Sequence, residues 1–483
     1  MIRVICNQET FVYNAYHMVK AFYPSETVTS SVDEKASNYV TVEFAEDGTD
    51  GQKEAMIEIA DRQTNDMPAE KSAMKKYLDR MLYKKLSEQS GRTLAWGILM
   101  GVRPTKIAMR KLEEGMTQET FVPWFQKENL VSEEKAHLAW QIAGREKKLL
   151  DQLDYENGYS LYVGIPFCPT VCSYCSFSSG ALGDWEHRVE DYLAALMKEL
   201  EAIAKMSEGR KADTIYMGGG TPTTLNADQL DRLLTCIDRH FVRKGLLEFT
   251  VEAGRPDSIT REKLETLKKW DITRISINPQ TMKDETLKII GRRHTVAQTV
   301  ESFQLARELG FDDINMDLIM GLPEESLEDV RDTLEQVKAL KPDNLTVHSL
   351  ALKRAARLNM FKEDYKDYKM VNTTEHMNLT AEYAKEMGLE PYYLYRQKSM
   401  AGNLENVGYA SPGKAGIYNI LIMEEKQTIV ACGAGASTKR VWNEPNPDGT
   451  HRIERCENVK DVAQYIERID EMIERKQKLF AEE

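Results

Sequence analysis

The sequence contains no long apolar segment, few cysteines and no concentration of charge of one sign. No apolar run among its 483 residues approaches the roughly 20 that a membrane-spanning helix needs. The opening residues, MIRVICNQETFVYNAY, also lack the basic flank and apolar core of a secretory signal, so we expect a cytoplasmic protein. The net charge is −13 and basic residues are scattered among acidic ones, which argues against a nucleic-acid partner.

Cysteine is scarce, and only three of the seven cysteines lie near one another in the sequence. An odd, sparse set indicates a reducing compartment rather than a disulfide framework. The other four are isolated from any neighbouring ligand. We expect each of these to be a small buried hydrophobic residue: Cys6, Cys236, Cys432 and Cys456.

Length and composition indicate a globular protein of several parts. Hydrophobic residues make up 42% and charged residues 29%, and 483 residues require two or three domains unless a barrel takes much of the length. Residues 1–62 combine strand-like alternation with one helical stretch and predict a small α+β unit. Residues 63–155 predict a helical extension, interrupted at 101–106 by GVRPTK.

The next region alternates short apolar runs with helical segments. In residues 156–390 the runs are LYVGI, TIYM, EFTVEA, RISIN, INMDLIM and LTVHSLAL. Such alternation predicts parallel strands with covering helices, and we interpret it as a partial (β/α)6 barrel of an α/β protein. Residues 391–483 predict a smaller C-terminal α+β region, with strand-like IYNILIM and QTIVACGAG and a closing helix near 457–480.

Three cysteines follow the first predicted barrel strand in the loop FCPTVCSYC. Cys168, Cys172 and Cys175 offer three thiolates to a four-iron cluster, which leaves one iron open to a ligand. A zinc ion is the alternative. A zinc site usually requires a fourth ligand from a second cysteine or histidine pair, and the neighbouring sequence supplies none.

Further chemistry-bearing residues lie where later strands end. The segment MGGGTPT follows the second strand, and its glycines allow a ligand close to the backbone, with N–H groups that suit a carboxylate; an ordinary turn is the alternative. Glu252, Gln280 and Asp317 end three other strands and are predicted to face the barrel interior, either to hold a ligand or to bond one another. Arg292 is expected to pair with a carboxylate or lie on a solvated loop, and His348 to face outward.

The spacing C-x3-C-x2-C, with an aromatic residue before the last cysteine, resembles the radical S-adenosylmethionine (SAM) superfamily. This resemblance implies a [4Fe–4S] cluster whose open iron binds SAM, and a 5′-deoxyadenosyl radical formed by SAM cleavage. The set LYVGIPFCPTVCSYCSF, GGGTPT, VEAGRP, GRRHT and MDLIMGLP resembles the oxygen-independent coproporphyrinogen III dehydrogenase family. GVRPTK and YYLYRQKSMAGNLENVGY are similar to its HemZ-type branch.

The family resemblance implies roles for individual residues. Tyr162 would lie near the cluster, and the SAM site would be lined by Gly219, Gly220, Thr221, Glu252, Gln280, Arg292, Asp317 and Ala351. The implied reaction is oxidative decarboxylation of two propionates of coproporphyrinogen III to vinyls, giving protoporphyrinogen IX for haem biosynthesis. The implied partners are a tetrapyrrole and a reduced flavodoxin or ferredoxin-type electron donor.

Two positions depart from the best-characterised branch of the family. Gly164 replaces a histidine and Phe177 replaces a fourth cysteine. Relatives that share these departures include haem chaperones and haem-processing enzymes, and both remain alternatives. A tetrapyrrole would need cations for its propionates, and the candidates are Lys353, Arg354, Arg396 and Lys398.

Overall fold

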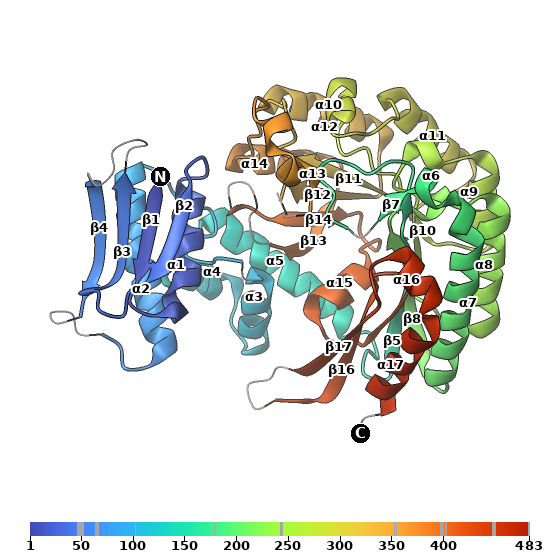
Figure 1. Ribbon diagram of the computed structural model, residues 1–483, viewed down its shortest axis with the longest axis horizontal. Coiled ribbons are helices and arrows are strands. Elements are labelled where there is room, and N and C mark those ends of the chain that lie inside the picture. Colours follow the sequence, from blue (N-terminus) through green and yellow to red (C-terminus); the bar gives the residue numbers. More distant parts are fainter. Residues whose placement is uncertain are drawn as a thin grey trace. The chain divides into compact units, whose positions relative to one another are not determined.

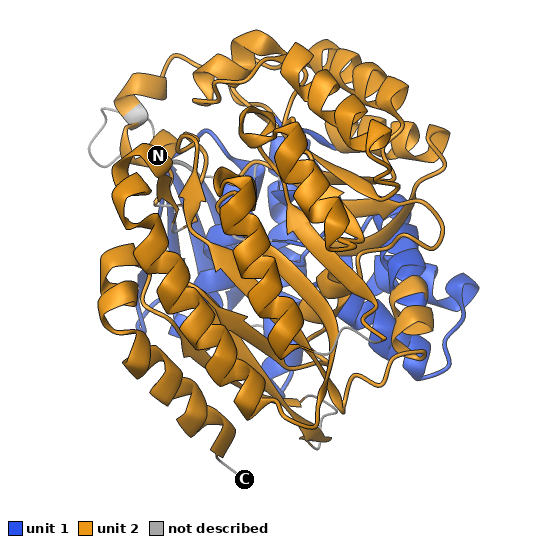
Figure 2. Ribbon diagram, turned by 90° about the vertical axis from the view of Figure 1, so that its right-hand side faces the viewer, with its two compact units in different colours: residues 1–144, 372–374, 395–405 blue, residues 145–371, 375–394, 406–483 orange. Residues whose placement is uncertain are grey.

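A computed structural model describes residues 1–45, 53–62, 67–101, 103–177, 179–241, 245–351, 353, 355–396, 400, 403–446 and 451–481. The chain forms two compact units, coloured separately in Figure 2. Unit 1 comprises Met1–Gly144, Asn372–Thr374 and Tyr395–Glu405, and unit 2 comprises Arg145–Val371, Glu375–Leu394 and Asn406–Glu483. The four domain ranges expected from the sequence remain a prediction.

Unit 1 contains a four-stranded sheet in the order β2-β1-β3-β4, with β1 parallel to β2 and antiparallel to β3. Its apolar core joins alternate strand residues to helices α1 and α2. Helix α2 ends at Gly91, which has φ +65°. The sequence break at 101–106 is confirmed, because α3 begins at Pro104. The elements are β1 (Ile2–Cys6), α1 (Glu9–Phe22), β2 (Val28–Val32), β3 (Asn38–Ala45), β4 (Lys53–Asp61), α2 (Lys71–Ser90), α3 (Pro104–Glu113), α4 (Gln118–Asn129) and α5 (Glu133–Leu150), which continues into unit 2.

Unit 2 is built on six parallel strands that hydrogen-bond in chain order (Figure 1). The pairings are β5 with β8, β8 with β9, β9 with β10, β10 with β11 and β11 with β12. All six apolar runs predicted as strands are confirmed. The strands are β5 (Gly158–Ile165), β8 (Lys211–Gly219), β9 (Glu248–Glu252), β10 (Arg274–Ser276), β11 (Ile314–Met320) and β12 (Asn344–Ser349).

Helices cover the outer face of these strands, and Figure 2 shows them as a layer over the sheet of unit 2. They begin at good N-caps: the Asn226, Thr295 and Ser326 side chains each accept a hydrogen bond from the third helical residue and complete a capping box. The connecting helices are α6 (Leu182–Trp185), α7 (Val189–Met206), α8 (Ala227–His240), α9 (Arg261–Lys269), α10 (Asp284–Ile289), α11 (Val296–Glu308), α12 (Leu327–Leu340), α13 (Arg357–Met360) and α14 (Thr374–Glu386).

The C-terminal strands extend the same sheet. Among the described residues it has eleven strands, with β13 (Glu390–Tyr395) and β14 (Asn406–Ala410) beyond β12, and β15 (Ile429–Cys432), β16 (Ser437–Pro445) and β17 (His451–Glu457) beyond β5. Strand β15 runs parallel to β5, so QTIVACGAG is a strand as predicted. The closing helix is confirmed as α16 (Val462–Glu467) and α17 (Ile469–Ala481). The sheet has two free ends in the described part of the chain, and the barrel is therefore partial, as predicted.

The prediction that IYNILIM is a strand is wrong, because these residues form helix α15 (Ile417–Glu424). A continuous apolar run does not distinguish a buried strand from a buried helix. Here Gly416 is the N-cap residue, and the Ile417 N–H donates to Glu248 Oε2 at 2.6 Å. The Tyr418 ring stacks on Tyr216 with ring centres 4.5 Å apart, which places α15 against the inner face of the strands.

Candidate functional site

The two faces of the six parallel strands differ sharply in polarity. Leu161, Val163 and Ile215 alternate with inner-face residues and are fully buried. On the other face, register places Tyr162 opposite Tyr216, and Glu252 opposite Ser276. A parallel sheet covered on both faces by apolar packing has near-continuous hydrophobic strands, so a polar inner face indicates a site for a ligand.

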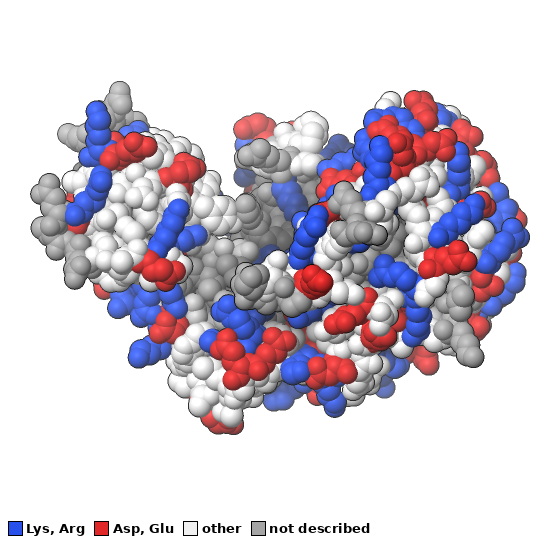
Figure 3. All heavy atoms as spheres, turned by 90° about the horizontal axis from the view of Figure 1, so that it is seen from below, with Lys and Arg blue, Asp and Glu red and all other residues white. Residues whose placement is uncertain are grey.

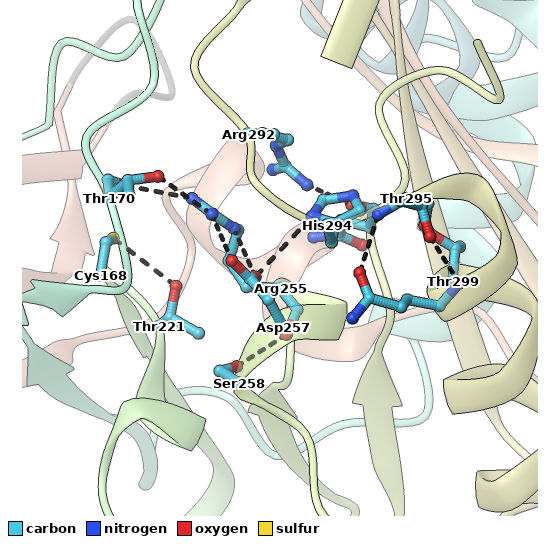
Figure 4. A network of polar contacts seen from close by, with 12 residues as sticks. Cys168, Thr170, Thr221, Arg255, Asp257, Ser258, Arg292, His294, Thr295 and Thr299 are labelled. Atoms are coloured by element: carbon cyan, nitrogen blue, oxygen red, sulfur yellow. Dashed lines mark hydrogen bonds and ion pairs between the residues drawn. The ribbon is translucent and has the colours of Figure 1, made fainter. Parts of the chain in front are cut away.

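The cysteine loop lies between two short strands at the ends of the main ones. It connects β6 (Phe167–Cys168) to β7 (Gly180–Ala181), which pair in parallel. Burial, followed by the charges of neighbouring thiols, raises the pKa of both Cys168 and Cys175. The Thr221 hydroxyl donates to Cys168 Sγ at 3.5 Å (Figure 4). The three cysteines are therefore neighbours that interact electrostatically, as a shared cluster requires.

The donor set fits a cluster with one thiolate on each of three irons. In the described part of the chain, no group of three or more His, Cys, Asp or Glu side chains converges on a single ion position. A four-iron cluster makes no such demand, since each thiolate binds a different iron. The four isolated cysteines are buried and free, as predicted. The site residues predicted for SAM remain predictions.

Backbone hydrogen bonds connect the glycine motif to the start of the cysteine loop. The Gly220 N–H donates to Ile165 O and the Thr221 N–H to Phe167 O, each at 2.7 Å. These two N–H groups therefore hold the two loops together, and the expectation that N–H groups of the glycine motif suit a carboxylate stays a prediction. Gly219 has φ +105°, which favours glycine, and a Cβ on Gly220 would lie 2.5 Å from Phe167 O. Glycine is required here so that two loops can approach each other.

Glu252 and Asp317 both belong to the polar inner face, as predicted. Tyr216 Oη donates to Glu252 Oε1 at 2.5 Å, and burial followed by the nearby charge of Asp317 raises the pKa of Glu252 to about 7. Burial also acts to raise the pKa of Asp317, but the neighbouring His348 and the hydrogen bond from Asn315 outweigh it and lower that pKa. The two neighbouring carboxyls therefore have pKa values shifted in opposite directions.

The prediction that His348 faces outward is wrong. Its Nε2 lies 3.7 Å from Asp317 Oδ2, on the inner face. An outward side chain is expected if inward and outward side chains alternate from His348 to Ala351. Strand β12 ends at Ser349, so this alternation does not extend to residue 351. His348 has the same parity as Thr346, whose strand neighbour is Asp317.

Gln280 and Arg292 carry buried polar atoms that need a partner. Gln280 has φ +69° and is 7% exposed, and its Oε1 has no hydrogen-bond partner among the described residues. Arg292 is 6% exposed; it donates to Asn278 O at 2.6 Å and to Tyr174 Oη at 3.2 Å, while its Nε has no partner in the described part of the chain. Arg292 therefore does not lie on a solvated loop, and its pairing with a carboxylate stays a prediction. Unsatisfied buried polar atoms of this kind mark a ligand site.

A second polar network, unpredicted from the sequence, adjoins the cysteine loop. Arg255 binds Asp257 through two hydrogen bonds of 3.0 and 2.8 Å and donates to Thr170 in the loop (Figure 4). It also donates to Cys172 Sγ at 3.6 Å. Burial acts to raise the pKa of Asp257, but the neighbouring His294, whose Nδ1 lies 3.7 Å from Asp257 Oδ1, and the hydrogen bonds from Arg255 lower it strongly. The only sequence signal was the position of Arg255 in VEAGRP, directly after a strand-end carboxylate.

Two cavities flank the cysteine loop. One, of about 240 Å³, lies between Tyr162, Gly219 and the residues that follow Cys175, including Phe177. The other, of about 810 Å³, lies between Pro169–Val171 and the segment Gly291–Thr295, and its cations include Lys288, Arg293 and Arg357. The Phe177 side chain is 72% exposed beside the smaller cavity.

Comparison with known proteins identifies the family. A family model for the radical SAM superfamily matches residues 162–337. The chain is 41% identical over 460 residues to the oxygen-independent coproporphyrinogen-III oxidase-like protein HemZ of Bacillus subtilis, covering 94% of this chain and 90% of that protein. The chain belongs to this HemZ-like family of radical SAM proteins. Members of the radical SAM superfamily bind a [4Fe–4S] cluster and SAM, so the predicted cofactors are confirmed.

Other relatives of this radical SAM protein match a smaller part. The chain is 38% identical over 193 residues to the haem chaperone HemW of Bacillus subtilis, covering 40% of this chain and 50% of that protein. The solved coproporphyrinogen III oxidase HemN from Escherichia coli superposes with a TM-score of 0.53 at 23% identity, covering 68% of this chain and 73% of that one. This superposition supports the predicted fold class. No helix among the described residues is both long and apolar enough to cross a membrane.

Proposed function

We propose that this radical SAM enzyme oxidatively decarboxylates two propionates of coproporphyrinogen III to vinyl groups, giving protoporphyrinogen IX. The observation that carries the proposal is the position of three neighbouring thiols beside a polar strand face, together with two buried atoms, Gln280 Oε1 and Arg292 Nε, that have no partner among the described residues. The near full-length similarity to a coproporphyrinogen-III oxidase-like protein supports it. A reduced flavodoxin or ferredoxin-type protein would supply the electron, and cytoplasmic location stays a prediction.

Each residue of the site has a role that its contacts support. Cys168, Cys172 and Cys175 would hold the cluster, and SAM bound there would supply the 5′-deoxyadenosyl radical. Glu252, ionised, would accept hydrogen bonds from the SAM ammonium. Gln280 Oε1 and Arg292 Nε would gain the partners they lack. The other residues that we propose to line the SAM site are Tyr162, Gly219, Gly220, Thr221, Asp317 and Ala351.

The substrate side requires cations for propionate carboxylates, and the structure changes the candidates. Arg396 is 6% exposed and donates to Leu99 O at 2.5 Å and Asn403 O at 2.7 Å, so its guanidinium is committed within unit 1. Lys353 lines neither of the two cavities, and Arg354 and Lys398 lie outside the described residues. We therefore propose the cations of the larger cavity, Lys288, Arg293 and Arg357, as the propionate partners.

The deciding experiment is anaerobic incubation of reconstituted protein with coproporphyrinogen III, SAM and a chemical reductant, followed by mass analysis of the porphyrin. The proposal expects loss of two carboxyl groups as carbon dioxide, with matching 5′-deoxyadenosine. Tight haem binding with slow SAM cleavage and an unchanged porphyrinogen would overturn it. That result would favour a chaperone role, in keeping with the similarity to HemW.

A further inference from the structure

Arg255 is a buried arginine whose guanidinium connects two segments of the site. It follows β9 in the chain and is 3% exposed. Its Nε and one terminal nitrogen bind the two carboxylate oxygens of Asp257, at 3.0 and 2.8 Å. The terminal nitrogens also donate to Thr170 O at 3.0 Å and Thr170 Oγ1 at 3.1 Å. Figure 4 shows this guanidinium between the cysteine loop and Asp257.

The same guanidinium reaches a cysteine sulfur. Arg255 Nη1 lies 3.6 Å from Cys172 Sγ, within hydrogen-bond distance for a sulfur acceptor. Thr221 makes a comparable contact with Cys168 Sγ, but through a neutral hydroxyl. Arg255 is thus a charged donor directed at one of the three thiols.

We propose that Arg255 is a positioning residue that orients Cys172 and raises the reduction potential of the cluster bound there. The proposal rests on the assignment of Cys172 as a cluster ligand. A hydrogen bond to a ligating sulfur stabilises the additional negative charge of the reduced cluster, and such bonds are a principal determinant of cluster potential. A higher potential makes it easier for an electron donor to reduce the cluster.

The geometry explains why an arginine serves here. Its planar fork binds the Asp257 carboxylate with two bonds while its other edge binds Thr170, so the donor is fixed in direction. Asp257 offsets part of the positive charge of the Arg255 guanidinium, while the N–H···S bond stays directed at Cys172 Sγ, on which the charge of Arg292 also acts. His294 is buried against this pair, with Nδ1 3.7 Å from Asp257 Oδ1, too far for a hydrogen bond. A lysine would keep the positive charge but could not make the paired hydrogen bonds to Asp257 and Thr170 at the same time.

The test compares Arg255→Gln, Arg255→Lys and the control Arg261→Gln in full-length, anaerobically reconstituted protein. Arg261 is a matched control, because it is an arginine near Arg255 in sequence that is 46% exposed and pairs with Glu308. Iron and sulfide content, the electron paramagnetic resonance spectrum of the reduced cluster and its midpoint potential are measured without tetrapyrrole. These measurements depend only on the cluster, so they stay informative even if the protein does not decarboxylate coproporphyrinogen III.

We expect Arg255→Gln to retain iron, because all three thiols remain, and to have a lower midpoint potential. The expected change in the ratio of reduced to oxidised cluster at fixed potential is about tenfold, or about 59 mV for a one-electron couple. Arg255→Lys should fall between Arg255→Gln and the wild type, and Arg261→Gln should match the wild type. An unchanged potential in iron-replete Arg255→Gln would overturn the proposal. Loss of iron from both Arg255 variants would overturn it equally, since the residue would then only maintain the fold of the loop.

Discussion

Glu199 and Glu252 are carboxylates of unit 2, the first fully buried and the second partly buried, and their surroundings differ. Glu199 belongs to a C-terminal cluster in which Lys476 donates to it at 2.7 Å and Asn458 at 2.9 Å, with Tyr465 bonded to its other oxygen. Glu252 belongs to an interior cluster with Tyr216, Asp317 and His348, in which no Lys or Arg among the described residues forms a salt bridge with it.

The difference between the two clusters separates a structural role from a functional one. In the C-terminal cluster, Glu199 and Lys476 are fully buried and satisfy each other, so the chain supplies its own counter-charge. In the interior cluster, the chain supplies a carboxyl with a raised pKa, and we propose that a ligand supplies the counter-charge. A carboxylate that lacks a cation in a buried site is expected where a cationic ligand binds.

The largest expected effect comes from the thiols beside the interior cluster. Alanine in place of Cys168, Cys172 or Cys175 should remove most of the iron and the visible absorption of the reconstituted protein, because one cluster iron would lose its only protein ligand. Cys236→Ser is the control, since Cys236 lies on α8 apart from the loop. Full iron and normal SAM cleavage in any of the three alanine variants would refute that cysteine as a ligand.

The next effect should fall on stability, in the C-terminal cluster. Lys476→Met leaves Glu199 buried without its cation and should cost about 3–5 kcal/mol, measured as a large fall in thermal midpoint. Lys478→Met on the same helix is the matched control; its side chain is 73% exposed, and its loss should change stability by less than about 0.5 kcal/mol. Adding Glu199→Gln to Lys476→Met should recover part of the loss. No fall in midpoint would contradict the structural role of this pair.

The architecture could largely be predicted from the sequence, because strand alternation and helix caps are local signals. The three cysteines were equally visible, since their ligand chemistry depends on residue type and spacing. Helix α15 could not be predicted, because its apolar run fits a buried strand as well as a buried helix. The contacts that accompany the helix, Tyr418 stacking on Tyr216 and the hydrogen bond to Glu248, are visible only in the structure. Arg255 was missed because its partners Thr170 and Cys172 are more than eighty residues away in sequence.

Glu252→Gln should weaken SAM binding without lowering stability, whereas Lys476→Met should lower stability. SAM affinity should fall about tenfold to a hundredfold in equilibrium binding, because the ammonium loses a charged acceptor. Stability at pH 8 should not fall. Folding raises the pKa of Glu252 from its ordinary value to about 7, so the ionised group costs stability above that pH, and glutamine removes the cost. Glu265→Gln, an exposed change, is the control. Unchanged affinity would place SAM elsewhere.

The raised pKa of Glu252 predicts that SAM binding depends on pH. Below pH about 7, a proton competes with the SAM ammonium for Glu252, so wild-type affinity should fall up to about tenfold per pH unit. In Glu252→Gln this slope should disappear, while the weaker affinity persists. Binding is measured between pH 5.5 and 8 under conditions that keep the cluster intact by its absorption. A parallel slope in both proteins would assign the titration to another group.

The smallest effect is expected at two arginines, Arg396 and Arg293, which differ in the same way as the two carboxylates. Arg396 resembles Lys476 in having fixed partners, and its ring neighbour Trp96 lies 5.4 Å from its guanidinium. Arg293 is exposed at the larger cavity and has no salt bridge or hydrogen bond among the described residues. Arg293→Ala should therefore raise the KM for the porphyrinogen about twofold to fivefold, as expected for an exposed ion pair, and leave thermal stability unchanged. Arg396→Ala should lower the thermal midpoint and leave the KM unchanged; the opposite pattern would return Arg396 to the substrate site.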